Sequence, residues 1–270
     1  MQVNSSNIQP HYTINETNSE YPAAQCQLHL LIAPTSISIA IYHVEKNLFC
    51  SLKKYLVDAA SIVDSLDKLF LQEALLQFHY QSYHIHLFAV ETILIPYEAN
   101  ENIITDMLFE DIAALEATMY YKCPKELLNY FNKKSYFNIH SSSAQLLQNL
   151  IKKQALLKTP VVYAHCFDTH LEVIAFDDKQ LVLHTIFPIE QPEDFTYLIL
   201  SVYESLQFST AKVRTVLIGT ISKPSRIYDL LYTYIHDVEF INILSSINYH
   251  NAFNDIEDHI IYPLASLFKP

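Results

Sequence analysis

The sequence predicts a mixed α/β protein built from two halves of similar organisation. Stretches in which apolar and polar residues alternate are typical of strands, and apolar residues spaced by three and four are typical of helices. Both kinds occur in the same order, strand, strand, strand, helix and strand, first from Leu28 and again 133 residues later from Val161. With 50% hydrophobic residues, a chain of 270 residues can form one large core or two smaller ones.

The first series is expected to start near Cys26. The expected elements are strands at 28–32, 37–41 and 48–57, a helix at 62–76 and a strand at 84–90. In the second strand, Ile37, Ile39 and Ile41 alternate with small residues, which indicates one buried face. The helix is predicted from apolar residues spaced by three and four, and Asp58 or Ser61 is available as its N-cap.

The segment that follows is interpreted as the remainder of the first half. Its expected elements are a helix at 102–115, a strand at 117–123, a helix at 124–132, a strand at 136–140 and a helix ending near Leu157. Ser141–Ser143 supplies an N-cap cluster for the last helix, a simpler role than that of an activated serine. Thr159–Pro160 marks the boundary, because the residue before proline is pushed out of helical conformation.

The second half repeats this order. Its expected elements are strands at 161–167, 171–175 and 181–189, a helix at 193–207, a strand at 213–218, a helix at 225–235 and a strand at 238–243. The predicted division is therefore a disordered polar leader at 1–24, a first lobe at 25–159 and a second lobe at 160–270.

A three-stranded meander followed by a crossover helix and a further strand describes a mixed β-sheet with packed helices. Formed twice, this plan resembles the duplicated ribonuclease H-like domains of the actin-like ATPase architecture. That resemblance implies two lobes facing one another across a cleft, with nucleotide bound where the β-turns of both lobes converge.

Several stretches also resemble an uncharacterised bacterial family, a domain-of-unknown-function family found mainly in Bacteroidota, whose fold is that of a degenerate actin-like ATPase. They are the opening strands together with Ile93–Pro96, Cys123–Leu128, Asn138–Ser143 and Val216–Gly219. The resemblance covers about 26–262 and rests on order and spacing. It implies a fold and no activity.

Glycine is almost missing from this chain. Gly219 is the only one, although average usage would give roughly 19. Phosphate-binding loops use glycine for positive φ and for close approach of the backbone to the anion. The P-loop, the dinucleotide-binding motif and the nucleophile elbow are all absent from the sequence.

Active actin-like ATPases carry an acidic residue and glycines in two phosphate loops, and a glycine-rich adenosine loop. The corresponding positions here give five candidate residues of a degenerate cleft, which are Thr35, Asp168, Thr169, Gly219 and Thr220. Pro34 removes a backbone donor from the first loop. The resemblance would allow Asp168 to bind Mg²⁺ through water, but turns also select aspartate for conformational reasons. We therefore expect no catalytic residue and no cofactor.

Histidine is abundant, with 13 residues, but no metal site is expected. His84 and His86 share a face of a predicted strand, a spacing that can chelate, yet the sequence indicates no third ligand. His165 and His170 flank the second turn and could approach each other. Ordinary strand positions explain both pairs more simply.

Charge and cysteine content limit the partners. A net charge of −12 with only 17 basic residues argues against nucleic acid. The sequence contains no apolar run of about 18 residues, so no membrane partner is expected. The four cysteines form no C-x-x-C motif and are expected as reduced thiols in a cytoplasmic protein.

Three functions follow from these observations. The leading hypothesis is a non-catalytic protein that binds an unknown partner protein, with a homodimer as one option, through surfaces such as Tyr228, Tyr232 and Tyr234. The alternative is an atypical ATPase or phosphotransferase that uses the cleft between the lobes. The third is a small-molecule sensor that uses this cleft without phosphate recognition.

Overall fold

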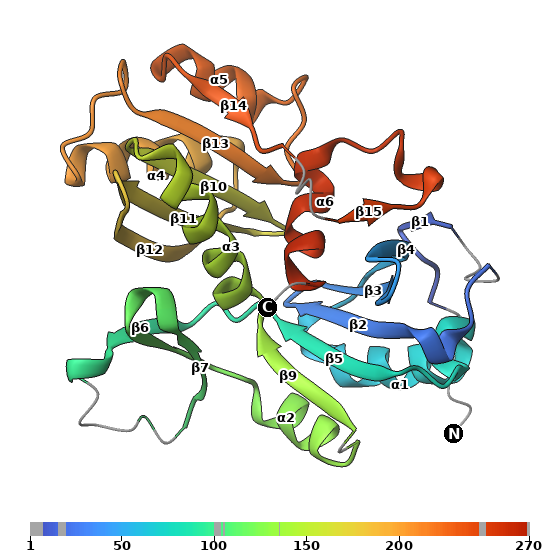
Figure 1. The fold of residues 1–270 in the computed structure, drawn as a ribbon. Helices are drawn as coiled ribbons and strands as arrows, with labels where there is room; N and C mark the ends of the chain where they lie inside the picture. The colour runs from blue at the N-terminus through green and yellow to red at the C-terminus, as the bar shows by residue number, and fades with distance from the viewer. Residues whose placement is uncertain are drawn as a thin grey trace. The chain divides into compact units, whose positions relative to one another are not determined.

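The computed structural model has the mixed α/β architecture that the sequence predicts (Figure 1). It describes residues 8–15, 20–99, 104, 106–134, 136–242 and 247–268. The chain divides into two compact units, each made of separate stretches of sequence. Unit 1 comprises 1–88, 123–142 and 245–255, and unit 2 comprises 89–122, 143–244 and 256–270.

Unit 1 contains a mixed sheet in the order β1-β4-β3-β2-β5-β9, with β15 paired to β4. The strands are β1 (Tyr12–Ile14), β2 (Cys26–Ala33), β3 (Ser36–His43), β4 (Leu48–Leu56), β5 (Ser82–Leu87), β9 (Phe137–Ser141) and β15 (Asn248–Tyr249). Strands β2, β3 and β4 form an antiparallel meander, whereas β5 is parallel to β2 and β9 is parallel to β5. The predicted crossover therefore joins the meander to a parallel pair.

One face of this sheet packs against helices α1 (Ile62–Gln72) and α2 (Lys125–Asn132). Phe70 of α1 meets Phe137 of β9 with ring centroids 6.1 Å apart, and Phe131 of α2 meets the same ring at 5.6 Å. Leu28 and Leu30 of β2 are almost completely buried. Burial of this apolar stripe, at about 25 cal/mol per Å², stabilises the unit.

A buried ion pair joins β4 to the residue after α1. The Lys53 ammonium lies 2.9 Å from a Glu73 oxygen, and both side chains are 9% exposed. The Tyr55 hydroxyl and the Leu75 amide also donate to this carboxylate. Burial raises the pKa of Glu73, but these hydrogen bonds and the lysine charge outweigh it and lower the pKa overall.

Unit 2 contains a sheet in the order β12-β11-β10-β13-β14. The strands are β10 (Val161–Phe167), β11 (His170–Asp177), β12 (Gln180–Pro188), β13 (Arg214–Gly219) and β14 (Val238–Phe240). Strands β10, β11 and β12 are antiparallel, and β13 and β14 continue in parallel from β10.

The two sheets share strand order and strand direction. In each, the first two strands of the meander are joined by a two-residue turn, Pro34–Thr35 in unit 1 and Asp168–Thr169 in unit 2. Both sheets also carry a register shift at the same distance from that turn, after Ile41 and after Ala175. The turns and the strand pairings therefore identify equivalent positions in the two units.

Helices cover both faces of the sheet in unit 2. Helices α4 (Pro192–Ser205) and α5 (Arg226–Tyr234) contribute Phe195, Ile199 and Leu231 to one core. Helices α3 (Ser142–Leu157) and α6 (Asp258–Ala265) contribute Leu147 and Tyr262 to the other. Helix α6 has no counterpart among the sequence predictions, because Pro263 lies inside it and the segment before it shows no helical spacing.

The prediction of a helix at 102–115 is wrong for the part that the structure describes. A small antiparallel sheet, in the order β6-β8-β7, occupies this region with strands β6 (Thr92–Pro96), β7 (Leu108–Ile112) and β8 (Ala117–Tyr121). In β7 the more exposed positions, Phe109 and Asp111, alternate with more buried ones, so the period is two and not 3.6. Residues 102, 103 and 105 of the predicted helix lie outside the described residues.

Part of the predicted leader forms a strand. Residues 12–14 form β1, which pairs antiparallel with β4, while 1–7 and 16–19 lie outside the described residues. Residues 89–122 and 143–159, expected in the first lobe, belong to unit 2. The lobe boundary at 159/160 stays a prediction about folding units.

We expect Glu73→Gln to lower the free energy of unfolding by about 2–3 kcal/mol, because it leaves the Lys53 ammonium buried without its counter-charge. Urea denaturation followed by circular dichroism measures the change. The control is Glu91→Gln, which removes an ion pair to Lys122 whose carboxylate side chain is 61% exposed. This control is expected to lower the free energy of unfolding by less than about 1 kcal/mol. Equal losses in both variants would contradict the prediction.

Candidate functional site

Four of the five predicted site residues lie at one edge of the unit 2 sheet. Strands β10 and β13 are parallel, and Cys166 pairs with Gly219 where both strands end. Asp168 and Thr169 form the turn directly after β10, and Thr220 directly follows β13. In open α/β sheets, ligands bind outside the carboxyl ends of strands, so this edge is the place to examine.

Gly219 is required by a close approach of two strands. Its φ is +90°, and a Cβ atom there would lie 2.1 Å from the Cys166 carbonyl oxygen and 3.0 Å from Cδ2 of His165. Both the conformation and the space exclude a larger residue. The chain thus keeps its single glycine where β13 meets β10.

Three backbone amides after β13 donate to carbonyl groups inside the protein. The Thr220 amide donates to the Cys166 carbonyl oxygen at 3.1 Å, and the Ile221 amide donates to Gly219 at 3.0 Å. The Ser225 amide donates to Ser222 at 3.0 Å, and the Ser225 hydroxyl caps α5 by accepting from Tyr228. Backbone amides that bind phosphate must point at the anion, and these three point at carbonyl groups of the chain.

Asp168 has a positive φ of 51° at the first position of its turn. Aspartate is one of the few residues that tolerate this conformation, so the turn itself accounts for it. Thr169 is exposed, and its hydroxyl lies 3.2 Å from Nδ1 of His170. A role of Asp168 in binding Mg²⁺ through water stays a prediction of the resemblance.

The equivalent edge of unit 1 holds Thr35, the fifth predicted residue. Here Pro34 occupies the position of Asp168, and Leu87, paired with Ile32, occupies that of Gly219. Proline contributes no amide and cannot adopt a positive φ. The Phe88 amide donates to Ile32 at 2.9 Å, as the Thr220 amide does to Cys166. The residue after the strand is therefore tied back to the neighbouring strand in the same way in both units.

A buried carboxylate clamps three strands next to Gly219. Glu172 of β11 is fully buried, and its two oxygens lie 2.9 Å from Nδ1 of His165 on β10 and 2.9 Å from Nε2 of His184 on β12. Burial raises the pKa of Glu172, but the hydrogen bonds and charges of the two histidines reduce it to about 2. The carboxylate is ionised and acts as an acceptor for two imidazoles.

The sequence allowed His165 to approach His170 but favoured ordinary strand positions for both, and the structure pairs His165 with Glu172. Antiparallel register places these two residues directly opposite one another. The signal was present in the sequence, because a two-residue turn at Asp168–Thr169 fixes which residues face each other across the hairpin.

Four histidines share one face of the unit 1 sheet. His84 and His86 lie on β5 as predicted, and His29 of β2 and His140 of β9 lie beside them. Nδ1 of His29 is 2.8 Å from Nε2 of His86, and Nδ1 of His84 is 3.2 Å from Nε2 of His140. The His29 and His84 rings stack at 4.8 Å. The sequence could not reveal this histidine cluster because its members come from three strands.

The rings of the histidine cluster bond to each other and to neutral groups. Nε2 of His29 faces Gln27 at 3.2 Å, and Nε2 of His84 faces Ser82 at 2.9 Å. Across the described residues, no group of three or more His, Cys, Asp or Glu is arranged to hold a metal ion. Burial lowers the pKa of His29 well below its usual value, that of His84 to about 4, and also that of His140. These three rings are uncharged at neutral pH.

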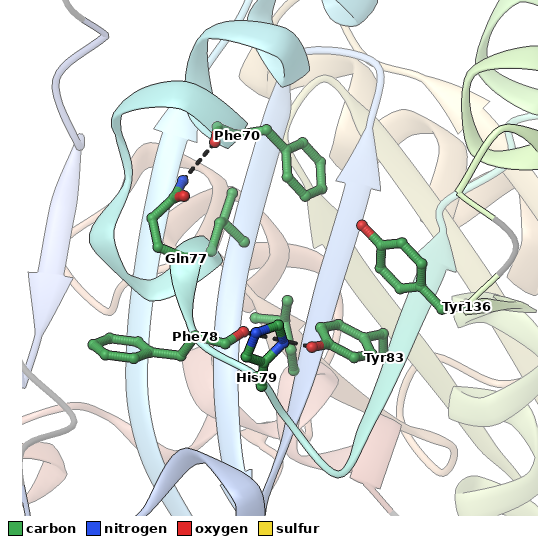
Figure 2. A pocket seen from close by; sticks show the side chains of 8 residues that line it. Phe70, Gln77, Phe78, His79, Tyr83 and Tyr136 are labelled. Atoms are coloured by element: carbon green, nitrogen blue, oxygen red, sulfur yellow. Dashed lines mark hydrogen bonds between the residues drawn. The ribbon is translucent and has the colours of Figure 1, made fainter.

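Unit 1 also has an aromatic pocket of about 380 Å³ (Figure 2). Its walls are Leu28, Phe70, Leu76, Gln77, Phe78, His79, Tyr83 and Tyr136. The Gln77 side chain is tied back to the Phe70 carbonyl oxygen at 2.6 Å, and the Tyr83 hydroxyl to that of Phe78 at 3.5 Å (Figure 2). Two of the polar side chains in its wall are therefore bonded to the backbone, and His79 and Tyr136 are further polar groups there.

The chain belongs to the family described as "Protein of unknown function (DUF3822)", which matches residues 15–238. The predicted membership of a domain-of-unknown-function family is therefore confirmed. Comparison with curated proteins finds no match. No helix among the described residues is both long enough and apolar enough to cross a membrane.

Solved structures confirm the predicted fold. A Bacteroides thetaiotaomicron protein with actin-like ATPase fold and unknown function matches with a TM-score of 0.74 at 19% identity, over 92% of this chain and 97% of that one. The PilM-PilN type IV pilus biogenesis complex matches with a TM-score of 0.57 at 10% identity, over 92% and 100%. The ethanolamine utilization protein EutJ from Carboxydothermus hydrogenoformans matches with a TM-score of 0.50 at 6% identity, over 94% and 95%. At these identities the likeness shows the actin-like ATPase fold alone.

We expect Gly219→Ala to destabilise the protein by about 3 kcal/mol, because the new Cβ meets the Cys166 carbonyl oxygen and the backbone conformation disfavours alanine. The control is Thr220→Ala, which changes the exposed neighbouring residue and is expected to lower the free energy of unfolding by less than about 1 kcal/mol. Chemical denaturation of both variants measures the difference. A Gly219→Ala variant as stable as the parent would show that the close approach does not exist.

The histidine cluster predicts that stability falls as pH is lowered from about 6.5 towards about 4.5. The folded-state pKa of His29, His84 and His140 lies below the unfolded value of about 6.5, so protons bind preferentially to the unfolded chain in this window. The stabilisation is complete above pH 6.5 and is lost on acidification.

Urea midpoints measured across this window should decline steadily, and less steeply in His84→Gln than in the parent. Carboxyl groups titrate mainly below about pH 4.5 and contribute little within it. The matched control is His79→Gln, which replaces an exposed histidine and should keep the parental slope. A midpoint that stays constant or rises on acidification would refute the assignment.

Proposed function

We propose that this protein uses the actin-like ATPase fold without nucleotide turnover and acts by binding another protein. The observation that carries the proposal is that the backbone amides directly after the strand at both sheet edges already bond to the chain. The amides of Phe88, Thr220 and Ile221 all donate to carbonyl groups of the chain. A phosphate group would have to compete with these bonds for its donors.

The turns support the same conclusion. Proline has no backbone N–H, so the first turn lacks at Pro34 the amide donor that the second turn has at Asp168. Only one acid and one glycine occur among the five candidates, which are Thr35, Asp168, Thr169, Gly219 and Thr220. We propose that these residues are remnants of a nucleotide site in a chain that arose by internal duplication, now a pseudo-ATPase.

Protein binding is supported by the surface and by the neighbours of the fold. Tyr232 and Tyr234 on α5 are 60% and 56% exposed, whereas Tyr228 is half-buried. Exposed aromatic residues are frequent at sites of protein association. The structurally similar PilM-PilN assembly is a complex of type IV pilus biogenesis, so a protein of this fold works there through a protein partner. The partner proposed here is a protein in the cytoplasm, and a second copy of the chain is one option.

The experiment is a test of nucleotide binding. We expect the melting temperature to stay unchanged at millimolar Mg-ATP, because a ligand that binds the native state would raise it. Hydrolysis should remain at background in both the parent and Asp168→Ala. The matched control is Asp178→Ala, which alters the other aspartate with a positive φ at a turn of the same sheet.

Mg-ATP hydrolysis well above background that disappears in Asp168→Ala and survives in Asp178→Ala would overturn the proposal. It would establish the atypical ATPase instead. A large rise in the melting temperature of the parent with Mg-ATP would show that nucleotide binds, and would likewise overturn the proposal.

A further inference from the structure

A groove of about 470 Å³ in unit 2 is lined by all three residues of β14. It is lined by Lys223, Tyr228, Val238, Glu239, Phe240, Ile241, Asn242, Glu257, Asp258 and His259. Strand β14, the residue before α6 and the start of α6 supply most of these residues. The groove, which we name the β14 groove, combines an open strand edge, a row of rings and a surplus of carboxylates.

The strand edge is the first of these features. Among the described residues, β14 is the last strand of its sheet and pairs only with β13. The Thr215 amide donates to Asp237 at 2.9 Å, and the Ile241 amide donates to Leu217 at 3.0 Å. Because parallel pairing uses alternate residues, the backbone groups of Val238 and Phe240 point away from β13. Such an edge can accept another strand.

The row of rings lies beside this edge. The Tyr228 ring stacks on Tyr232 at 5.9 Å and on Phe240 at 5.4 Å, and Phe240 meets His259 at 4.2 Å. Burial lowers the pKa of His259, whose Nε2 lies 2.5 Å from the Ile221 carbonyl oxygen. The row therefore carries no positive charge at neutral pH and presents ring faces that attract a cation.

Charge is the third feature. Glu239, Glu257 and Asp258 line the groove against the single cation Lys223. Glu239 and Glu257 are 48% and 54% exposed, although Glu239 also lies 3.0 Å from Arg214. The whole chain has a net charge of −12. An acidic segment would be repelled here, whereas a basic one meets complementary charge.

We propose that the β14 groove binds an extended, arginine-containing segment of a partner protein, which adds as a strand to β14. Arginine residues suit both features, because the planar guanidinium stacks on aromatic rings and forms paired hydrogen bonds with carboxylates. Tyr232, stacked on Tyr228 at the outer end of the row, provides an exposed ring, and Glu257 and Asp258 in the groove provide the carboxylates. The inference rests on the proposed role in protein binding and specifies where and what the protein binds.

The test uses a fluorescein-labelled peptide of alternating valine and arginine, with binding followed by fluorescence anisotropy. Saturable binding is expected to weaken about tenfold in the double variant Glu257→Gln, Asp258→Asn and several-fold in Tyr232→Ala. Tyr232 is 60% exposed, so its removal leaves the fold intact. The matched control is Glu126→Gln, Asp64→Asn, which removes the same charge from exposed positions of unit 1 and should change the affinity less than twofold.

Two altered peptides complete the test. Glutamate in place of arginine should abolish binding, and N-methylation of the alternate amides that would face β14 should weaken it strongly. Equal binding of the glutamate peptide, or equal losses in the groove and control variants, would overturn the inference. Full binding of the N-methylated peptide would overturn strand addition.

Failure here is distinguishable from failure of the proposed function. If a purified partner protein binds the parent and the groove double variant equally, the β14 groove is not its site and the inference is wrong, while the role in protein binding stands. If Mg-ATP is hydrolysed with dependence on Asp168, the proposed function is wrong whatever the peptide does.

Discussion

The approach of Gly219 to the Cys166 carbonyl oxygen is the contact on which the unit 2 site depends. It lets β13 end directly against β10, and it directs the Thr220 amide to the same carbonyl oxygen at 3.1 Å. In a phosphate-binding loop, glycine lets the backbone approach an anion. Here the glycine lets the backbone approach itself. The residue type is shared with nucleotide sites, but its physical role is different.

The two units carry different chemistry on one plan. Where unit 2 has Glu172 between His165 and His184, the equivalent positions of unit 1 are Ser38, Leu31 and Leu52. Conversely, His29, His84 and His86 of unit 1 correspond to the apolar core residues Tyr163, Val216 and Ile218 of unit 2. Each sheet therefore buries its own polar network, His29 with His86 and His84 with His140 in unit 1, and Glu172 with His165 and His184 in unit 2.

Sequence reasoning predicted the features that local patterns determine. The alternation of apolar and polar residues predicted the strands of the two meanders and β13, and apolar spacing by three and four predicted α1 and α4. Both patterns are visible in sequence because side-chain periodicity follows from backbone geometry. The short edge elements β1 and β15 were missed, since three residues or fewer show no periodicity. The helix predicted over 102–115 failed where the spacing of β7 is that of a strand. Asp168, Thr169, Gly219 and Thr220 lie together at one sheet edge, and their role as a site stays a prediction, whereas the histidine cluster required cross-strand register.

The most direct test of the account observes the backbone donors themselves. Amide chemical shifts of Thr220, Ile221 and the Asp168–Thr169 turn can be followed by NMR during titration with Mg-ATP. We predict that these signals do not move, because the Thr220 and Ile221 amides already bond to the chain. Saturable shifts confined to these residues would show that the edge opens to bind phosphate, and would contradict it.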